Sequence, residues 1–255
     1  MSLVTETDLY LRGASTLVAS WDQYARAAAG ATLLRSPGVA IGLFPNEPER
    51  SVYNNALFER DLPSAQRLGA VDAMESAYEQ AGIPRFAAWV HEADFGMRAE
   101  LERRGYSTTE STRAMGMALD EIPRPRPAVD VVRADWAEHR RVGELPPGLL
   151  AAGAHDRFHI LVARLAGENV ATGLAFDVDG DCGIYNVGTL EHARRRGLGT
   201  ALTVALLCDA VDRGCCTATL QSTPMAERVY ASVGFRDLGL IFEYAPPHPA
   251  AVTSG

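Results

Sequence analysis

The sequence has few of the residues that mark metal centres, disulfide frameworks and nucleic-acid surfaces. Its four cysteines lie in the second half and form no C-x-x-C pair, so we predict neither a zinc site nor a disulfide framework. A formal net charge of -8 provides no general basic surface, and we expect no nucleic-acid partner. No apolar run spans a membrane, and no basic segment precedes an apolar core near the N-terminus. We therefore expect a cytoplasmic protein without signal peptide or membrane partner, its cysteines being small core residues.

Six histidines are present, without a metal-binding pattern. His155 and His159 are four residues apart, but His159 falls in an apparent strand, where this spacing does not bring two imidazoles together. We expect structural or surface roles for both and no bound metal.

Prolines divide the 255-residue chain into nearly equal halves. Residues 120–127 read DEIPRPRP, and alternating prolines cannot donate backbone hydrogen bonds and favour extended chain. The predicted organisation is a domain of residues 1–119, a Pro-rich linker of 120–128, a second domain of 129–245 and a flexible tail of 246–255.

The second half predicts three antiparallel strands followed by helix, strand, helix and strand. The first helix carries apolar residues around much of its circumference and ends at Gly214. Thr223 is predicted to cap the second helix and Pro224 to occupy its first turn. In chain order, the predicted elements cover residues 158–165, 170–178, 182–190, 198–213, 217–221, 223–234 and 238–244.

The first half gives a similar order, with strands at 39–44, 51–58 and 86–90 and helices at 63–82 and 93–104. Residues 53–57 (YNNAL) resemble residues 185–189 (YNVGT), and the helix ending at Gly105-Tyr106 resembles the one ending at Gly234-Phe235. Their common order predicts a duplicated domain.

The strongest local motif is residues 194–200 (RRRGLGT), which follow a strand and open a helix. Two glycines let a ligand approach the backbone closely, and free N–H groups at a helix start favour an anion, so the motif predicts a pyrophosphate cradle. No GK[ST] sequence is present, and Leu202 stands where a dinucleotide fingerprint needs its third glycine. A solvated arginine run beside an ordinary helix start is the alternative.

Two segments resemble a known family. Residues 187–202 (VGTLEHARRRGLGTAL) resemble the R/Q-x-x-G-x-G/A motif of the GCN5-related N-acetyltransferases, the GNAT family. Residues 220–235 (LQSTPMAERVYASVGF) resemble its second signature, a helix ending in Tyr-x-x-x-Gly-Phe. The resemblance covers roughly residues 129–245. It implies an α+β fold of two GNAT-like domains, each a mostly antiparallel sheet flanked by helices.

By this resemblance the chain binds acetyl-CoA as co-substrate and transfers the acetyl group to an amine. The strand around Val187 would bind the pantetheine arm through its backbone, and amides at the helix start would hold the pyrophosphate. Ser222 and Thr223 stand where many family members carry Asn, and capping is their alternative role. The implied cofactor-binding residues are Val187, Thr189, Arg194, Arg195, Arg196, Gly197, Leu198, Gly199, Thr200 and Ser222.

Tyr230 matches the tyrosine that serves as general acid in the family, because a phenol is protonated at neutral pH and can donate to the departing thiolate. It also falls on an apolar helix face, so simple packing with a tethered hydroxyl is the alternative. Glu191, Asp177 and Glu227 are candidate general bases by proximity, as is a water chain, and the sequence selects none of them.

The first half lacks the cradle motif and places Leu101 opposite Tyr230, which predicts a degenerate GNAT-like copy. Trp89, His91 and Asp94 would line a pocket there, or serve in core packing and capping. We expect an N-acetyltransferase. A non-catalytic acyl-CoA-binding regulator and a GNAT-fold interaction module are the rival readings. The acceptor amine and the oligomeric state, including a homodimer, stay open.

Overall fold

The computed structural model describes residues 4–46, 53–122, 129–145 and 157–247, which form two compact units. Unit 1 comprises residues 1–28 and 112–239, and unit 2 comprises residues 29–111 and 240–255. This division differs from the predicted boundaries at 119 and 129. The first helix groups with the second half of the chain, and the last strand contributes residues to unit 2. Most of the predicted linker and tail, and His155, lie outside the described residues.

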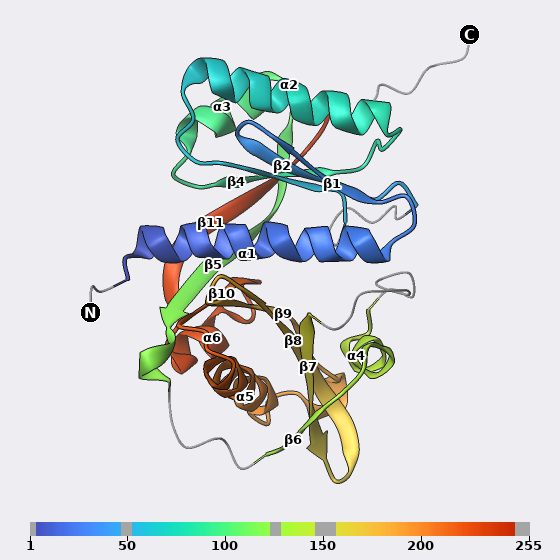
Figure 1. The fold of residues 1–255 in the computed structure, drawn as a ribbon, viewed down its shortest axis with the longest axis vertical. Coiled ribbons are helices and arrows are strands. Elements are labelled where there is room, and N and C mark those ends of the chain that lie inside the picture. Colours follow the sequence, from blue (N-terminus) through green and yellow to red (C-terminus); the bar gives the residue numbers. More distant parts are fainter. Residues whose placement is uncertain (1–3, 47–52, 123–128, 146–156, 248–255) are drawn as a thin grey trace. The chain divides into compact units, whose positions relative to one another are not determined.

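Unit 1 is built on the strand order β5–β10–β9–β8–β7–β6 (Figure 1). Every pair is antiparallel except β9 with β10. Strands β5 (Ser107–Ala118) and β11 (Arg236–Ala245) contribute residues to both units. The remaining elements of unit 1 are α1 (Glu6–Ala27), η1 (Leu119–Glu121), β6 (Asp130–Arg133), α4 (Trp136–Gly143), β7 (Phe158–Leu165), β8 (Glu168–Val178), β9 (Asp181–Thr189), η2 (Glu191–Ala193), α5 (Leu198–Asp212), β10 (Thr217–Ser222) and α6 (Glu227–Val233).

The predicted order of the second half is confirmed from β7 to β11, with one correction. Helix α6 begins at Glu227, and Thr223 does not cap it. Instead the Ala226 amide donates to the Thr223 carbonyl at 2.9 Å, which closes a separate turn before the helix. Strand β10 runs on to Ser222, so Thr223 and Pro224 directly follow the strand end and belong to this turn.

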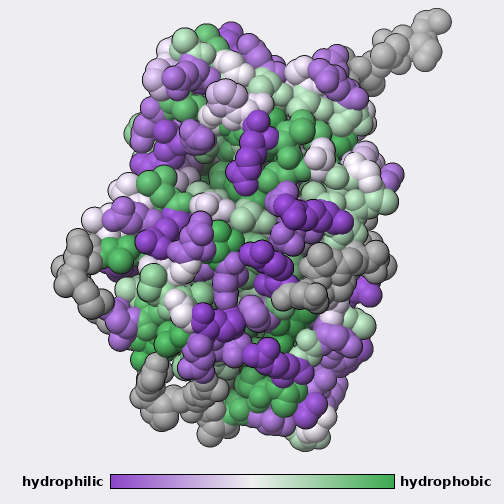
Figure 2. Space-filling model, viewed as in Figure 1, coloured by the Kyte–Doolittle hydropathy of each residue, from purple (hydrophilic) through white to green (hydrophobic). Residues whose placement is uncertain are grey.

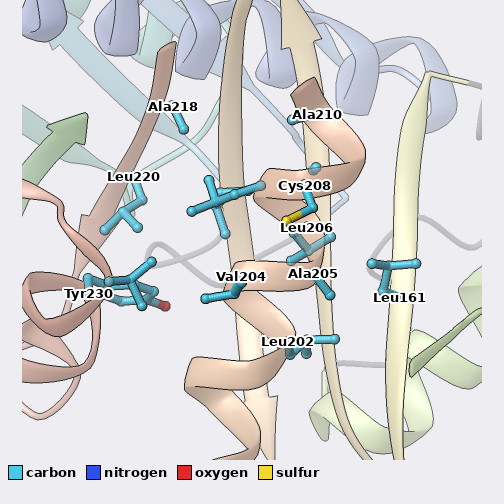
Figure 3. Close-up of a cluster of buried hydrophobic side chains, with 14 of the residues drawn as sticks. Leu161, Leu202, Val204, Ala205, Leu206, Cys208, Ala210, Ala218, Leu220 and Tyr230 are labelled. Atoms are coloured by element: carbon cyan, nitrogen blue, oxygen red, sulfur yellow. The ribbon is translucent and has the colours of Figure 1, made fainter. Parts of the chain in front are cut away.

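One face of the unit 1 sheet is covered by α5 and α6. As predicted, α5 is buried around most of its circumference, from Leu198 to Ala210. Figure 3 shows its side chains between those of β7 and β10, with Tyr230 of α6 beside Leu220. This apolar cluster holds the crossover helix against the sheet, so the helix start stays at a fixed place beside the end of β9.

The other face carries α1 and α4, and Figure 1 shows α4 across the sheet from α5. Helix α1 begins with a capping box in which Thr5 and Asp8 exchange side-chain and backbone hydrogen bonds. Its Tyr24 stacks on Phe158 at 5.1 Å between ring centroids, and Trp136 of α4 meets the same ring at 5.3 Å. Aromatic rings therefore join both helices to β7.

Unit 2 has the order β1–β2–β3–β4–β11, antiparallel except for β3 with β4. Its other elements are β1 (Thr32–Ser36), β2 (Val39–Leu43), β3 (Asn55–Phe58), α2 (Ser64–Gln80), β4 (Ala87–His91) and α3 (Phe95–Arg103). A separate apolar core lies between its strands and helices, including Met74, Tyr78, Met97 and Tyr244. The predicted α+β class, with mostly antiparallel strands, is confirmed.

Hydrophilic and hydrophobic residues are interspersed over the face shown in Figure 2. Among the described residues, no helix combines the length and hydropathy that crossing a bilayer requires.

Candidate functional site

Helix α5 starts directly after Gly197, within the motif of residues 194–200. Gly197 precedes the helix with φ of 74°, and no side chain caps the helix. The first bond inside the helix runs from the Ala201 amide to the Gly197 carbonyl at 2.9 Å, so the three amides before it have no intrahelical partner. A Cβ added at Gly197 or Gly199 would meet no atom within 4 Å in the part of the chain that the structure describes. The predicted motif thus forms an open helix start that suits an anion.

The three arginines of the motif differ in their surroundings. Arg194 donates from Nε to the Thr189 carbonyl at 3.1 Å, which ties the loop to the end of β9. Arg195 has φ of 61°, a left-handed conformation that turns the chain toward Gly197. Arg195 and Arg196 are exposed, so both add positive field at the helix start.

Strand β9 carries a bulge next to this loop. Ala171 and Thr172 of β8 pair with Thr189 and Gly188, whereas Leu174 pairs with Tyr185, so the register shifts by one residue. Two residues of β9, Asn186 and Val187, therefore oppose Gly173 alone. Asn186 adopts φ of 51°, a conformation that Asn tolerates better than most residues.

Beyond one end of their ladder, β9 and β10 separate. Their parallel pairing covers three residue pairs and stops at Gly183 with Thr219, although β9 continues to Thr189 and β10 to Ser222. The paired end is held by buried Asp181, which accepts hydrogen bonds from Thr16, Thr217 and Thr219 at 2.7–2.8 Å. The strands are thus paired at one end and separate at the other.

Tyr230 lies in α6, 8% exposed, against the core that also contains Leu220 and Val204. Its ring meets Phe235 edge-on at 5.9 Å. Burial raises the pKa of its phenol to about 12. Among the described residues, no hydrogen bond holds its hydroxyl.

The remaining predicted contact residues lie at the ends of the two splayed strands. Val187 and Thr189 are half-buried at the end of β9. Ser222 is buried at the end of β10, and its hydroxyl donates to the Thr223 carbonyl at 2.9 Å. Because β9 and β10 run parallel, Thr189 and Ser222 lie at the same end of this strand pair.

Two candidate bases are occupied elsewhere. Asp177 lies near the β8–β9 turn, away from the bulge, and forms an ion pair with Arg213. Although burial opposes ionisation, the hydrogen bonds and charge of Arg213 lower the pKa of this carboxyl. Glu227 pairs with Arg113 at 3.1 Å. Glu191, in η2, is exposed.

His139 is a polar group near the bulge that the sequence reading did not single out. It is fully buried in α4, and its Nδ1 lies 2.7 Å from the hydroxyl of Thr172. Burial lowers the pKa of its imidazole to about 4. An Asp-x-x-Glu pattern at residues 135–138 was the available sequence signal, because Asp135 caps α4.

In unit 2, the three residues predicted either to line a pocket or to pack and cap have local structural roles. Asp94 caps α3 by accepting from the Met97 amide at 2.9 Å, and His91 accepts from the Ala93 amide at 3.1 Å. Trp89 is buried in β4. Leu101, predicted opposite Tyr230, is a fully buried core residue.

A cavity of about 500 Å³ opens between α1 and the β8–β9 turn, lined by Asp8, Arg12 and Asp179 among others. It lies at the paired end of β9, not at the splayed end, so it is separate from the candidate site. No group of potential metal ligands occurs among the described residues.

Residues 156–237 match the family model described as "Acetyltransferase (GNAT) domain". The match spans the bulge of β9, the start of α5 and Tyr230. No protein with a curated description matches the chain.

Solved structures share the fold over nearly the whole chain. A GCN5-related N-acetyltransferase from Kribbella flavida has a TM-score of 0.70 and 19% identity, covering 93% of this chain and 97% of its own. One from Sphaerobacter thermophilus has a TM-score of 0.57 and 16% identity, covering 94% and 92%. A tandem GNAT protein from the clavulanic acid biosynthesis pathway has a TM-score of 0.59 and 16% identity, covering 92% and 97%. At these identities the likeness establishes the fold.

Proposed function

We propose that this chain, whose residues 156–237 carry a GNAT acetyltransferase domain, transfers an acetyl group from acetyl-CoA to a primary amine by direct attack. The observation that carries the proposal is the uncapped start of α5 beside a bulged and splayed β9. A helix start binds a diphosphate, and an unpaired strand edge binds an amide-containing arm. Coenzyme A contains both groups.

In this proposal the amides from Arg195 to Thr200 bind the pyrophosphate. The backbone of Val187 and Thr189 pairs with the pantetheine arm, which places the thioester in the splay between β9 and β10. Ser222, at the end of β10, contacts the arm from the other side. Arg194 holds the cradle loop against β9 through the Thr189 carbonyl.

The transfer itself needs a proton to reach the sulfur. The amine nitrogen, once deprotonated, attacks the carbonyl carbon, whose oxygen is polarised by the Val187 amide. The C–S bond then breaks, and the thiolate takes the proton of the Tyr230 hydroxyl, which the proton released by the amine replaces. The raised pKa of Tyr230 keeps that hydroxyl protonated at neutral pH.

Unit 2 is proposed to be a degenerate relative of unit 1 that has kept the strand order and lost the site. We place the reaction in the cytoplasm, because Cys182, Cys208 and Cys215 are buried free thiols, as reducing compartments maintain. The net charge of -8 favours a cationic acceptor by steering.

Calorimetry with acetyl-CoA, followed by an amine panel, tests the proposal. We expect the wild type to bind acetyl-CoA and to release CoA with at least one amine. Tyr230→Phe should keep the affinity and lose about 100-fold or more in turnover. Tyr78→Phe is the matched control, because Tyr78 is a buried tyrosine of unit 2 whose hydroxyl donates to the Gly42 carbonyl.

The rival functions give other results. Binding of acetyl-CoA without transfer to any amine would indicate a regulator. No binding at all would indicate an interaction module and would refute the proposal.

A further inference from the structure

A buried hydrogen-bond chain links α4, β8 and β7 at the bulged end of β9. The Thr172 hydroxyl donates to the Leu161 carbonyl at 3.3 Å. A hydroxyl has one hydrogen, so its oxygen must accept from the other partner, His139 Nδ1, at 2.7 Å. With the Thr172 hydrogen directed to Leu161, the imidazole carries its proton on Nδ1.

Burying this polar pair costs folding free energy. His139 and Thr172 are both fully buried. Desolvation keeps the ring neutral, and its Nε2 has no hydrogen-bond partner among the described residues. A buried lone pair without a partner destabilises the fold, which a leucine of similar size would avoid. Among the described residues, the hydrogen bond to Thr172 is thus the one polar contact recorded for this buried ring.

The location of the hydrogen bond between His139 and Thr172 indicates its role. Thr172 pairs with Gly188, the residue directly after the bulge of Asn186 and Val187. The last turn of α4 packs on the same pair: a Cβ at Gly143 would lie 3.4 Å from the Thr172 methyl, and one at Gly188 would lie 3.6 Å from the Gly143 Cα. Helix α4 therefore contacts both strands where the register shifts.

We propose that His139 is a positioning residue of the transfer site, which through Thr172 fixes the bulge of β9 and thereby the backbone that binds the pantetheine arm. This inference rests on the proposed function. A bulge competes with regular pairing, and a one-residue slip would turn the Val187 amide away from the cleft. The hydrogen bond opposes that slip because it holds Thr172 at a fixed position relative to α4.

Four variants separate positioning from packing. His139→Leu and Thr172→Val remove the bond, whereas His139→Asn keeps a donor near Nδ1 and Thr172→Ser keeps the hydroxyl. We expect the first pair to weaken acetyl-CoA binding about 10-fold and to speed amide hydrogen exchange at residues 186–189. The second pair should stay within about threefold of the wild type. The double variant His139→Leu with Thr172→Val should be no worse than either single one.

Phe176→Leu is the stability control, because Phe176 is buried in β8 opposite Gly183, at the other end of the strand. It should lower stability and leave acetyl-CoA affinity unchanged. If the wild type binds acetyl-CoA and His139→Leu binds it equally well, the positioning role is refuted while the transferase proposal stands. If the wild type itself does not bind acetyl-CoA, the proposed function fails, and this inference fails with it.

Discussion

Both units connect the last strand of an antiparallel set to a parallel neighbour through one α-helix: β9, α5 and β10 in unit 1, and β3, α2 and β4 in unit 2. In unit 1, β9 is bulged and runs past its pairing with β10. In unit 2, β3 has four residues, of which three pair with β2 in regular register and three pair with β4. The same topology therefore gives parallel strands that separate in unit 1 and parallel strands that stay paired in unit 2.

Two asparagines illustrate the difference. Asn54, just before β3, has φ of 46°, and its amide side chain bonds the backbone of Phe44 in both directions. Asn186 has φ of 51° within β9 and is exposed. The same residue type closes a corner in unit 2 and leaves a bulge exposed in unit 1. Topology alone therefore does not make a site; the local departures from regular pairing do.

The largest effect on acetyl-CoA affinity is expected at the start of α5, compared with the start of α2. Gly199→Asp adds a carboxylate where the diphosphate is proposed to bind, and the added Cβ meets no neighbour. Acetyl-CoA affinity should fall about 1,000-fold, the loss of two charge-assisted hydrogen bonds. Thermal stability should hold, because an acid suits a helix N-terminus. Ala65→Asp, in the first turn of α2, is the matched control and should leave affinity unchanged.

The units should also differ in their response to pH. His139 has a pKa of about 4 in the fold against an ordinary 6.5, so as pH falls below 6.5 the unfolded chain binds a proton that the folded chain excludes. The free energy of unfolding should drop by about 3 kcal/mol between pH 6.5 and 4. Burial also lowers the pKa of His159, which adds a smaller effect in that window.

In unit 2, the hydrogen bonds of Arg103 and Arg104 lower the pKa of Glu100 from 4.5 to about 2, so its contribution is lost only as pH falls below 4.5. Glu138 of unit 1 titrates in that same lower range. Denaturant unfolding at pH 7.0, 5.0 and 4.5 gives the slope of the free energy of unfolding against pH. This slope should be flatter in His139→Asn than in the wild type. An unchanged slope in that variant would refute the assignment to His139.

A smaller effect is expected at the two asparagines. Asn186→Val places a β-branched residue in the left-handed region, at a cost of about 1–2 kcal/mol. Acetyl-CoA affinity should fall about 10-fold. Asn54→Val should lose more stability, because two hydrogen bonds to Phe44 also disappear, and should keep affinity. Equal losses of affinity in both variants would contradict the comparison.

The smallest effect is expected at the exposed arginines. The double variant Arg195→Gln with Arg196→Gln removes two positive side-chain charges but leaves every backbone amide in place. Acetyl-CoA affinity should therefore fall only about threefold at low salt. The difference from the wild type should vanish at high ionic strength. A salt-independent loss would contradict an effect of these charges acting through solvent.

Much of unit 1 could be predicted from local patterns. Strand β7 has the predicted bounds, and α5 starts at the predicted residue, because β-rich runs and a glycine-flanked apolar helix are local features. The start of α6 could not be predicted from Thr223 and Pro224, since the strand end uses those residues for a turn of its own.

The grouping of elements could not be predicted from chain order. Helix α1 joins unit 1 through tertiary contacts such as Thr16 with Asp181, 165 residues apart. The predicted division at the prolines follows the chain, whereas the compact units follow these contacts. Helix α4 and its His139 were missed because the segment is short, and its role depends on a bulge that only the pairing register reveals.

The central claim is that the amides opening α5 bind the diphosphate of coenzyme A. Backbone amide NMR during titration with CoA tests it most directly. We predict that the largest shifts occur at Gly197, Leu198, Gly199 and Thr200, followed by residues 186–189. Titration shifts confined to the first turn of α2, or absent from the start of α5, would contradict the claim.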